Sequence, residues 1–142
     1  MTRETMKKIL KLFVLAVMLA VPAMASAADQ LPKGFIAISE SEMTWDQAKA
    51  WCQQRGGRLP LIGGSSSLAT VPSGTPIDGF GSRGAPWPSG LPSDRYWTGT
   101  AGSDGSGEAW RAVDYGGNGG NGGKVYVFND DQSGTCRVVC VP

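Results

Sequence analysis

The side chains that could carry out chemistry are few, and one kind is missing. The 142-residue chain has no histidine. This removes the usual general base, the Ser-His-Asp and Cys-His arrangements and the common zinc sites. No pair of carboxylates is set apart by its spacing as the acid and base of a hydrolase. We therefore expect a protein that is not an enzyme and has no catalytic residues.

Three cysteines, Cys52, Cys136 and Cys140, are the next candidates. In an oxidising compartment a disulfide is expected, and an odd cysteine is then left over or pairs between molecules. Cys136 and Cys140 cannot pair with each other. Four residues of extended strand span about 13 Å, whereas bridged Cα atoms lie within about 7 Å. Both point to the same face of that strand, so either one is a partner for Cys52.

A free Cys136 would have one basic neighbour in the sequence, Arg137. On a strand, the side chain of Arg137 points to the opposite face. Nothing nearby would then lower the pKa of the thiol. We expect Cys136 to be buried as a small hydrophobic side chain.

Acidic and amide side chains near the end of the chain suit a hard cation. Asn129, Asp130 and Asp131 are adjacent, and Asp104 and Glu108 precede them. Calcium takes about six to eight oxygen ligands, and adjacent carboxylates supply only part of that number. The alternative, which the sequence favours, is a simple polar turn. We therefore expect that no cofactor is bound. Calcium is the one cofactor that these residues could accommodate.

The tryptophans offer aromatic faces on which sugars stack. Trp87 lies between two prolines in an irregular segment, so it is the candidate for ligand contact, together with Asn129, Asp130 and Asp131. The alternative for Trp87 is that it anchors this segment to the core. The remaining four fall in predicted helix or strands and are expected to pack in the core: Trp45, Trp51, Trp97 and Trp110.

A glycine-rich stretch matches the dinucleotide-binding fingerprint in sequence but not in its predicted structural context. It reads Gly-Asn-Gly-Gly-Asn-Gly from Gly117 to Gly122. The fingerprint requires a helix to follow, because the phosphates bind to N–H groups at a helix N-terminus. A strand pattern follows instead, from Lys124 to Asn129. We expect a flexible hairpin connection here.

The elements that must position these residues are one helix and several strands. The capping-box pattern from Thr44 to Gln47 and the Gly56-Gly57 stop predict a helix over 45–55, with Cys52 facing inward. Strands are predicted from β-branched and aromatic content at 35–39, 95–98, 108–115, 124–129 and 136–141. The fold class is therefore α+β, with one main N-terminal helix packed on a small antiparallel sheet with long irregular loops.

The segment 63–93 differs from the rest of the chain. It is rich in glycine, serine and proline and shows neither helical nor strand periodicity. We expect a long irregular surface segment, which in a small domain is often functional or mobile. A disordered insertion is the alternative.

Residues 1–27 have the pattern of a signal peptide. A basic start precedes an apolar run over 12–20 that is short for a membrane span, and Ala25-Ser26-Ala27 suits cleavage after Ala27. An uncleaved anchor and cleavage after Ala25 are the alternatives. The protein would then be periplasmic or secreted, with no membrane span after cleavage.

The mature part, residues 28–142, has the length of one domain. The leader holds four of the 13 basic and one of the 12 acidic side chains, so nine basic and eleven acidic side chains remain, a net charge of −2. This charge gives no drive toward nucleic acid or anionic lipid.

Residues 44–60, Thr-Trp-Asp-Gln-Ala-Lys-Ala-Trp-Cys-Gln-Gln-Arg-Gly-Gly-Arg-Leu-Pro, resemble the first-helix signature of C-type lectin-like domains. Trp87-Pro88, then Tyr96-Trp97-Thr98, then Val139-Cys140-Val141 are similar to the bacterial branch, which includes the lectin-like tips of the intimin and invasin adhesins. The resemblance implies a C-type lectin-like fold over 28–142 and a disulfide between Cys52 and Cys140. Closing a loop of about 90 residues in this way stabilises a domain by roughly 4 kcal/mol in the chain-entropy model.

The resemblance also implies a function, although a fold alone does not fix one. Sugar-binding members carry a Glu-Pro-Asn or Gln-Pro-Asp calcium tripeptide, which this sequence lacks, and a Trp-Asn-Asp, which Phe128-Asn129-Asp130 matches in part. The implied protein is an exported non-catalytic binding or adhesion module for a protein or carbohydrate ligand at the cell surface. The alternative is a structural or accessory subunit of a secreted or cell-surface assembly, linked through Cys136. A secreted enzyme ranks third.

We predict that the exported protein begins at Ala28. Intact-mass spectrometry of the native protein would give the mass of residues 28–142, because the small residues before Ala28 suit the export peptidase. A mass that includes residues 1–27 would contradict cleavage and favour the anchor.

Overall fold

A computed structural model describes residues 31–116 and 123–142. The predicted signal peptide and the Gly117–Gly122 stretch lie outside the described residues. In chain order the elements are β1 (Ala37–Ile38), α3 (Trp45–Gln53), β2 (Pro76–Ile77), β3 (Gly81–Ser82), β4 (Arg95–Ala101), β5 (Glu108–Tyr115), β6 (Lys124–Asp131) and β7 (Val139–Cys140). This arrangement is α+β and mostly strand, as the sequence predicts.

The helix α3 begins where its capping box predicts. The Oγ1 atom of Thr44 accepts from the backbone N–H of Gln47 at 3.4 Å, and the Gln47 side chain accepts from the Thr44 N–H at 3.0 Å. These reciprocal bonds satisfy N–H groups that have no partner within the helix. The helix ends at Gln53, two residues before the predicted end. Gly56, with φ of 76°, then reverses the chain as the sequence indicates.

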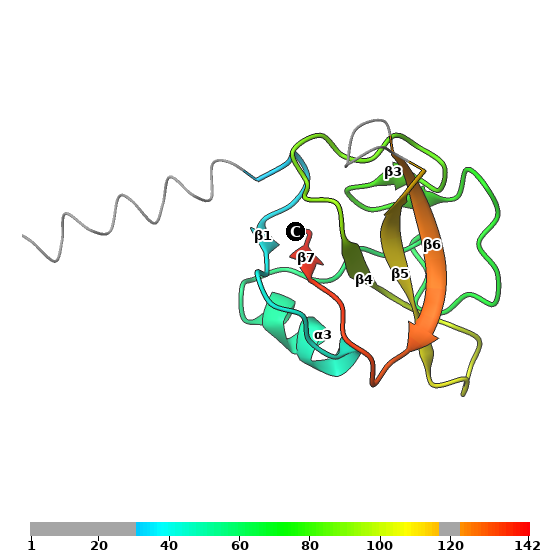
Figure 1. Cartoon of the computed structure of the whole chain (residues 1–142). Coiled ribbons are helices and arrows are strands. Elements are labelled where there is room, and N and C mark those ends of the chain that lie inside the picture. The colour runs from blue at the N-terminus through cyan, green and yellow to red at the C-terminus, as the bar shows by residue number, and fades with distance from the viewer. Residues whose placement is uncertain (1–30, 117–122) are drawn as a thin grey trace, which may run out of the picture. The chain divides into compact units, whose positions relative to one another are not determined.

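The central sheet is antiparallel, in the order β4-β5-β6 (Figure 1). The β5–β6 pairing runs without interruption from Tyr115 opposite Lys124 to Glu108 opposite Asp131. The predicted strand 108–115 is confirmed, and its two neighbours extend to Ala101 and Asp131.

The strands predicted at 35–39 and 136–141 are wrong in length. Only Ala37–Ile38 and Val139–Cys140 form strands, and they pair with each other as β1 and β7. Around them the chain makes isolated bridges, such as Met43 with Cys136 and Arg58 with Val141. The backbone partners in this region come from several segments, which keeps any one ladder short.

The two faces of the sheet are covered by different parts of the chain. Successive strand residues point to opposite faces. On one face Trp97 and Ala109 pack with Ala48 and Cys52 of α3. On the other face, Tyr96 and its neighbours pack against the segment 63–93. Figure 1 shows α3 on one side of the sheet and the green segment on the other.

The segment 63–93 is irregular, as predicted, but it is not merely a surface segment. It contains only the short hairpin of β2 and β3, and it buries five apolar side chains against the sheet. These side chains are Val71, Ile77, Phe80, Trp87 and Leu91. The segment therefore supplies one layer of the core. Apolar residues at irregular spacing can do this because the backbone turns repeatedly between them.

A disulfide joins Cys52 in α3 to Cys140 in β7, across a sequence separation of 88 and a Cα–Cα distance of 5.5 Å. This is the pairing implied by the resemblance. It leaves Cys136 free and buried. Among residues 31–116 and 123–142, no helix is both long enough and apolar enough to cross a membrane.

We predict that the C52A/C140A variant loses about 4 kcal/mol of unfolding free energy, because the unfolded chain is no longer closed into a long loop. Urea denaturation followed by tryptophan fluorescence measures the loss. The matched control is C136A, which keeps the disulfide and removes one buried sulfur atom. If both variants lose the same free energy, the crosslink contributes nothing beyond packing.

Candidate functional site

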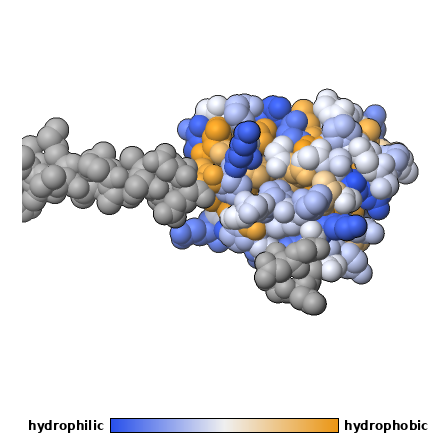
Figure 2. Space-filling view, turned by 90° about the horizontal axis from the view of Figure 1, so that it is seen from above, coloured by the Kyte–Doolittle hydropathy of each residue, from blue (hydrophilic) through white to orange (hydrophobic). Residues whose placement is uncertain are grey.

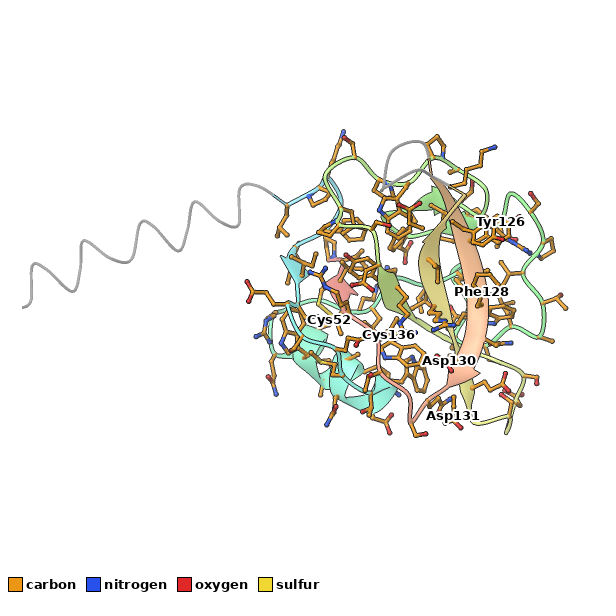
Figure 3. The ribbon with its side chains drawn as sticks, in the orientation of Figure 1. Cys52, Tyr126, Phe128, Asp130, Asp131 and Cys136 are labelled. Carbon is orange, nitrogen blue, oxygen red and sulfur yellow. A yellow bond between two sulfur atoms is a disulfide. The ribbon has the colours of Figure 1, made fainter. Side chains whose placement is uncertain are left out.

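The acidic side chains predicted as cation ligands gather at one end of the sheet. Asp130 and Asp131 end β6, and the register places Glu108 opposite Asp131. Figure 3 shows Asp130 and Asp131 at the arrowhead of β6. Asn129 precedes them on the same strand, and Asp104 lies in the connection between β4 and β5. The structure thus brings the predicted residues to one region of the molecule.

Within this region of the described residues, three of the four carboxylates have protein partners, and the exception is Glu108. Asp130 forms an ion pair with Arg111 at 3.0 Å, and Asp104 accepts from a serine hydroxyl at 3.2 Å. Asp131 accepts from the backbone N–H and the hydroxyl of Ser133, and these bonds lower the pKa of Asp131. In the part of the chain that the structure describes, no group of three or more carboxylate or cysteine side chains is placed to hold a metal ion. Calcium binding stays a prediction.

Trp87 is anchored in the core. Its side chain is 9% exposed, and its ring packs against Phe80 and Tyr96 with centroids 5.5 and 6.0 Å away. Its Nε1 atom donates to the carbonyl of Leu91 at 2.9 Å. Both the ring and its polar atom are therefore already engaged. The anchoring alternative describes Trp87, and the predicted ligand contact would require this packing to open.

Cys136 is buried between α3 and the sheet (Figure 3). Burial raises the pKa of its thiol to about 11, against the smaller opposing effect of the nearby Arg111. Arg137 points elsewhere, as predicted, and donates to the carbonyl of Ser39. The spacing of residues in the sequence does not indicate Arg111, because tertiary packing brings this residue of β5 near Cys136. The geometry keeps the thiol neutral and shielded.

Three aromatic side chains that the sequence did not indicate as a group lie together on one face of the sheet. We call Tyr115, Tyr126 and Phe128 the aromatic strip. The ring centroids of Tyr115 and Tyr126 are 5.0 Å apart, and those of Tyr126 and Phe128 are 6.1 Å apart. Tyr115 is 57% exposed and Phe128 is 40% exposed. These rings form an open platform, because α3 covers the β4 side of this face and leaves the β6 side uncovered.

The alternation within β6 contained part of this information. Val125 and Val127 are buried, so the residues between and after them, Tyr126 and Phe128, must point to the opposite face. Tyr115 could not be added from the pattern alone. It joins the strip because it lies opposite Lys124, which is two residues from Tyr126 and on the same face of the sheet.

Charged side chains flank the aromatic strip at both ends. Lys124 is exposed on the same face, opposite Tyr115. The guanidinium of Arg83 lies 5.5 Å from the Tyr126 ring centroid. Beyond Phe128 is the Arg111–Asp130 ion pair. The platform therefore has one basic group at the Tyr115 end, a second beside its middle ring, Tyr126, and a neutralised pair at the other end.

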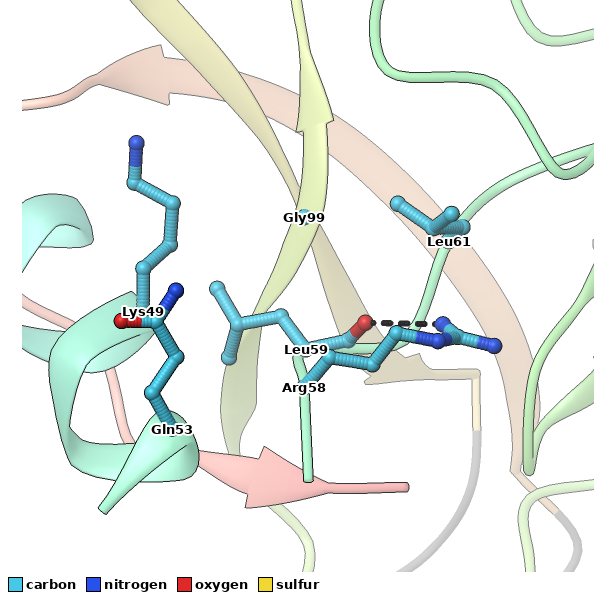
Figure 4. Close-up of a pocket in the computed structure, with 6 residues that line it drawn as sticks. All are labelled: Lys49, Gln53, Arg58, Leu59, Leu61 and Gly99. Atoms are coloured by element: carbon cyan, nitrogen blue, oxygen red, sulfur yellow. Dashed lines mark hydrogen bonds between the residues drawn. The ribbon is translucent and has the colours of Figure 1, made fainter. Parts of the chain in front are cut away.

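A small pocket of about 170 Å³ opens elsewhere, beside the last turns of α3 (Figure 4). Its polar side chains are Lys49, Gln53 and Arg58. Lys49 is paired with Asp46, and Arg58 with Asp78. Ligand pockets usually enclose about 300–1,000 Å³. This pocket is smaller and its cations are already paired, so the aromatic strip is the stronger candidate.

The surface seen from above in Figure 2 is mixed, with small hydrophobic areas between hydrophilic ones. On this face no single broad apolar patch marks a docking site. The candidate site is therefore defined by the ring geometry of the aromatic strip. Comparison with protein-family models, with curated proteins and with solved structures gave no match.

We predict that Cys136 in the native protein resists iodoacetamide at pH 8. A thiol whose pKa is about 11 is almost entirely protonated at that pH, and burial blocks access. Mass spectrometry would show no added label in the folded protein and one label after denaturation without reductant. Rapid labelling of the folded protein would contradict the burial of this thiol.

Proposed function

We propose that this protein is an exported, non-catalytic binding module of the C-type lectin-like kind, and that the aromatic strip is its ligand-binding surface. The observation that carries the proposal is a group of three adjacent rings on one sheet face, in which Tyr115 and Phe128 are exposed and Tyr126 is half-buried. Aromatic side chains dominate the energetics of binding surfaces, because each buries a large area at a small entropic cost. A strand register holds the rings in place before any ligand arrives, so little ordering is needed on binding.

The C-type lectin-like fold is supported by three features that agree with the resemblance. The helix begins at Trp45, the disulfide joins this helix to the last strand, and β1 pairs with β7. The long irregular segment between the helix and the main sheet stands where the family usually has a second helix, and here the chain departs from the resemblance. Export to the periplasm or the exterior is supported by the disulfide, which persists in oxidising compartments.

A binding role is also supported by the polar groups beside the aromatic strip. Asp130, on the same sheet face as the strip, is held by Arg111. An ion pair of this kind can orient a bound ligand without converting it into a product.

The accessory-subunit alternative receives less support. It depends on Cys136 as a link to a partner chain, and this thiol is fully buried in the core beside α3. An intermolecular disulfide would require that part of the core to open. The aromatic strip requires no such change.

We predict that Y115A, Y126A and F128A each weaken ligand binding at least tenfold. Truncation of a binding hot spot costs about 2 kcal/mol or more, and about 1.4 kcal/mol corresponds to a factor of ten. A ligand is first identified on glycan and protein arrays, and affinities are then measured by calorimetry.

The matched control is I36A, because Ile36 is 39% exposed and lies outside the aromatic strip. Thermal unfolding checks that all four variants fold. A ligand that binds the three strip variants as tightly as the parent protein would show that the binding surface is elsewhere.

A further inference from the structure

The unpaired positive charge beside the aromatic strip narrows the class of ligand. Five basic side chains form ion pairs with carboxylates of the described residues: Lys49, Arg58, Arg95, Arg111 and Arg137. Among residues 31–116 and 123–142, four basic side chains have no such partner, and two of these four, Lys124 and Arg83, lie beside the aromatic strip. The other two are Lys33 and Arg55. The mature chain nevertheless has more acidic than basic side chains. Two cations without a carboxylate partner beside one platform therefore point to an anionic ligand group.

The two cations are placed for this role. Lys124 begins β6, is exposed, and lies directly opposite Tyr115 in the register. Arg83 stands over the ring of Tyr126, and within the described residues it donates one hydrogen bond, to the carbonyl of Val71. A guanidinium has further N–H groups, so Arg83 can bind a carboxylate while this bond holds its position.

The rings and the cations together fit an acidic sugar. One face of a pyranose ring is rich in C–H bonds, and these pack against the electron-rich face of an aromatic ring. The tyrosine hydroxyls can exchange hydrogen bonds with sugar hydroxyls. We infer that the aromatic strip binds a polysaccharide that contains uronic acid, with one uronate carboxylate between Lys124 and Arg83. This inference rests on the proposed function and names its ligand class.

Other ligand classes fit the surface less well. A neutral glycan would use the rings and leave both cations without an anionic partner. Nucleic acid would bring closely spaced phosphates past Asp130, on the same face. A stable protein partner covers about 800 Å² on each side, which is more than the exposed parts of three rings provide. Lys124 at one end of the strip attracts a ligand carboxylate, and Asp130 at the other end does not. This arrangement favours a glycan of moderate charge density.

The test uses residues 28–142 and a panel of oligosaccharides from polygalacturonate, alginate and hyaluronate. Each is compared with its carboxyl-reduced, neutral form. We expect binding to at least one acidic oligosaccharide, and reduction of its carboxylates should weaken that binding at least tenfold. Raising the salt from about 0.1 to about 1 M shortens the screening length from about 10 to about 3 Å, so the affinity should fall.

The variants K124Q and R83Q should each weaken the same binding by roughly fivefold, because each removes one charge-assisted contact. The matched control is R55Q. Arg55 also stacks on an aromatic ring, that of Trp51, and also donates to a backbone carbonyl, but it lies at the end of α3. Its substitution should leave binding unchanged.

The outcomes separate this inference from the proposed function. Binding of neutral glycans alone, or acidic-glycan binding that K124Q and R83Q leave intact, would overturn the uronate assignment. If Y126A abolishes that binding, the aromatic strip remains the binding surface. Failure of every acidic oligosaccharide to bind also overturns the inference. A protein or nucleic-acid ligand that Y126A weakens would then retain the binding-module proposal with another ligand class.

Discussion

The disulfide between Cys52 and Cys140 is the constraint on which the rest of the structure depends. It fixes the end of α3 to β7, and β7 in turn pairs with β1. Both ends of the described domain are thereby held at the same place, although each of these two strands has only two residues. Strands this short contribute few ladder hydrogen bonds, so the covalent link and the apolar cluster around it replace what a longer ladder would supply.

One face of the central sheet is covered by α3 on the β4 side and is uncovered on the β6 side. The helix packs over β4 and buries Trp97, Ala109 and Cys136. It is only nine residues long and does not reach across β6. The same sheet face therefore changes from core to surface within three strands, and the aromatic strip occupies the uncovered part. Its rings are rigid because the opposite face of β6, through Val125 and Val127, is buried under the segment 63–93.

The segment 63–93 shows how a glycine-rich chain can form a core layer without regular structure. Phe80 packs edge-on against Phe35 and at a tilt against Trp87. Gly79, with φ of 73°, permits this, since a Cβ atom there would come within 2.5 Å of the Phe35 ring. Composition alone suggested mobility. The packing shows instead that turns at glycine bring widely spaced apolar side chains to one surface.

The sequence by itself determined the local elements and the limits on chemistry. The capping box set the start of α3, the alternation in 108–115 set β5, and the absence of histidine excluded the common catalytic arrangements. The tertiary structure decided which long-range groups meet. It selected Cys140 over Cys136 as the partner of Cys52, buried Trp87, and brought Tyr115 of β5 to Tyr126 of β6. Periodicity reports which face of its own strand a residue occupies, but neighbours across strands depend on register and on what covers each face.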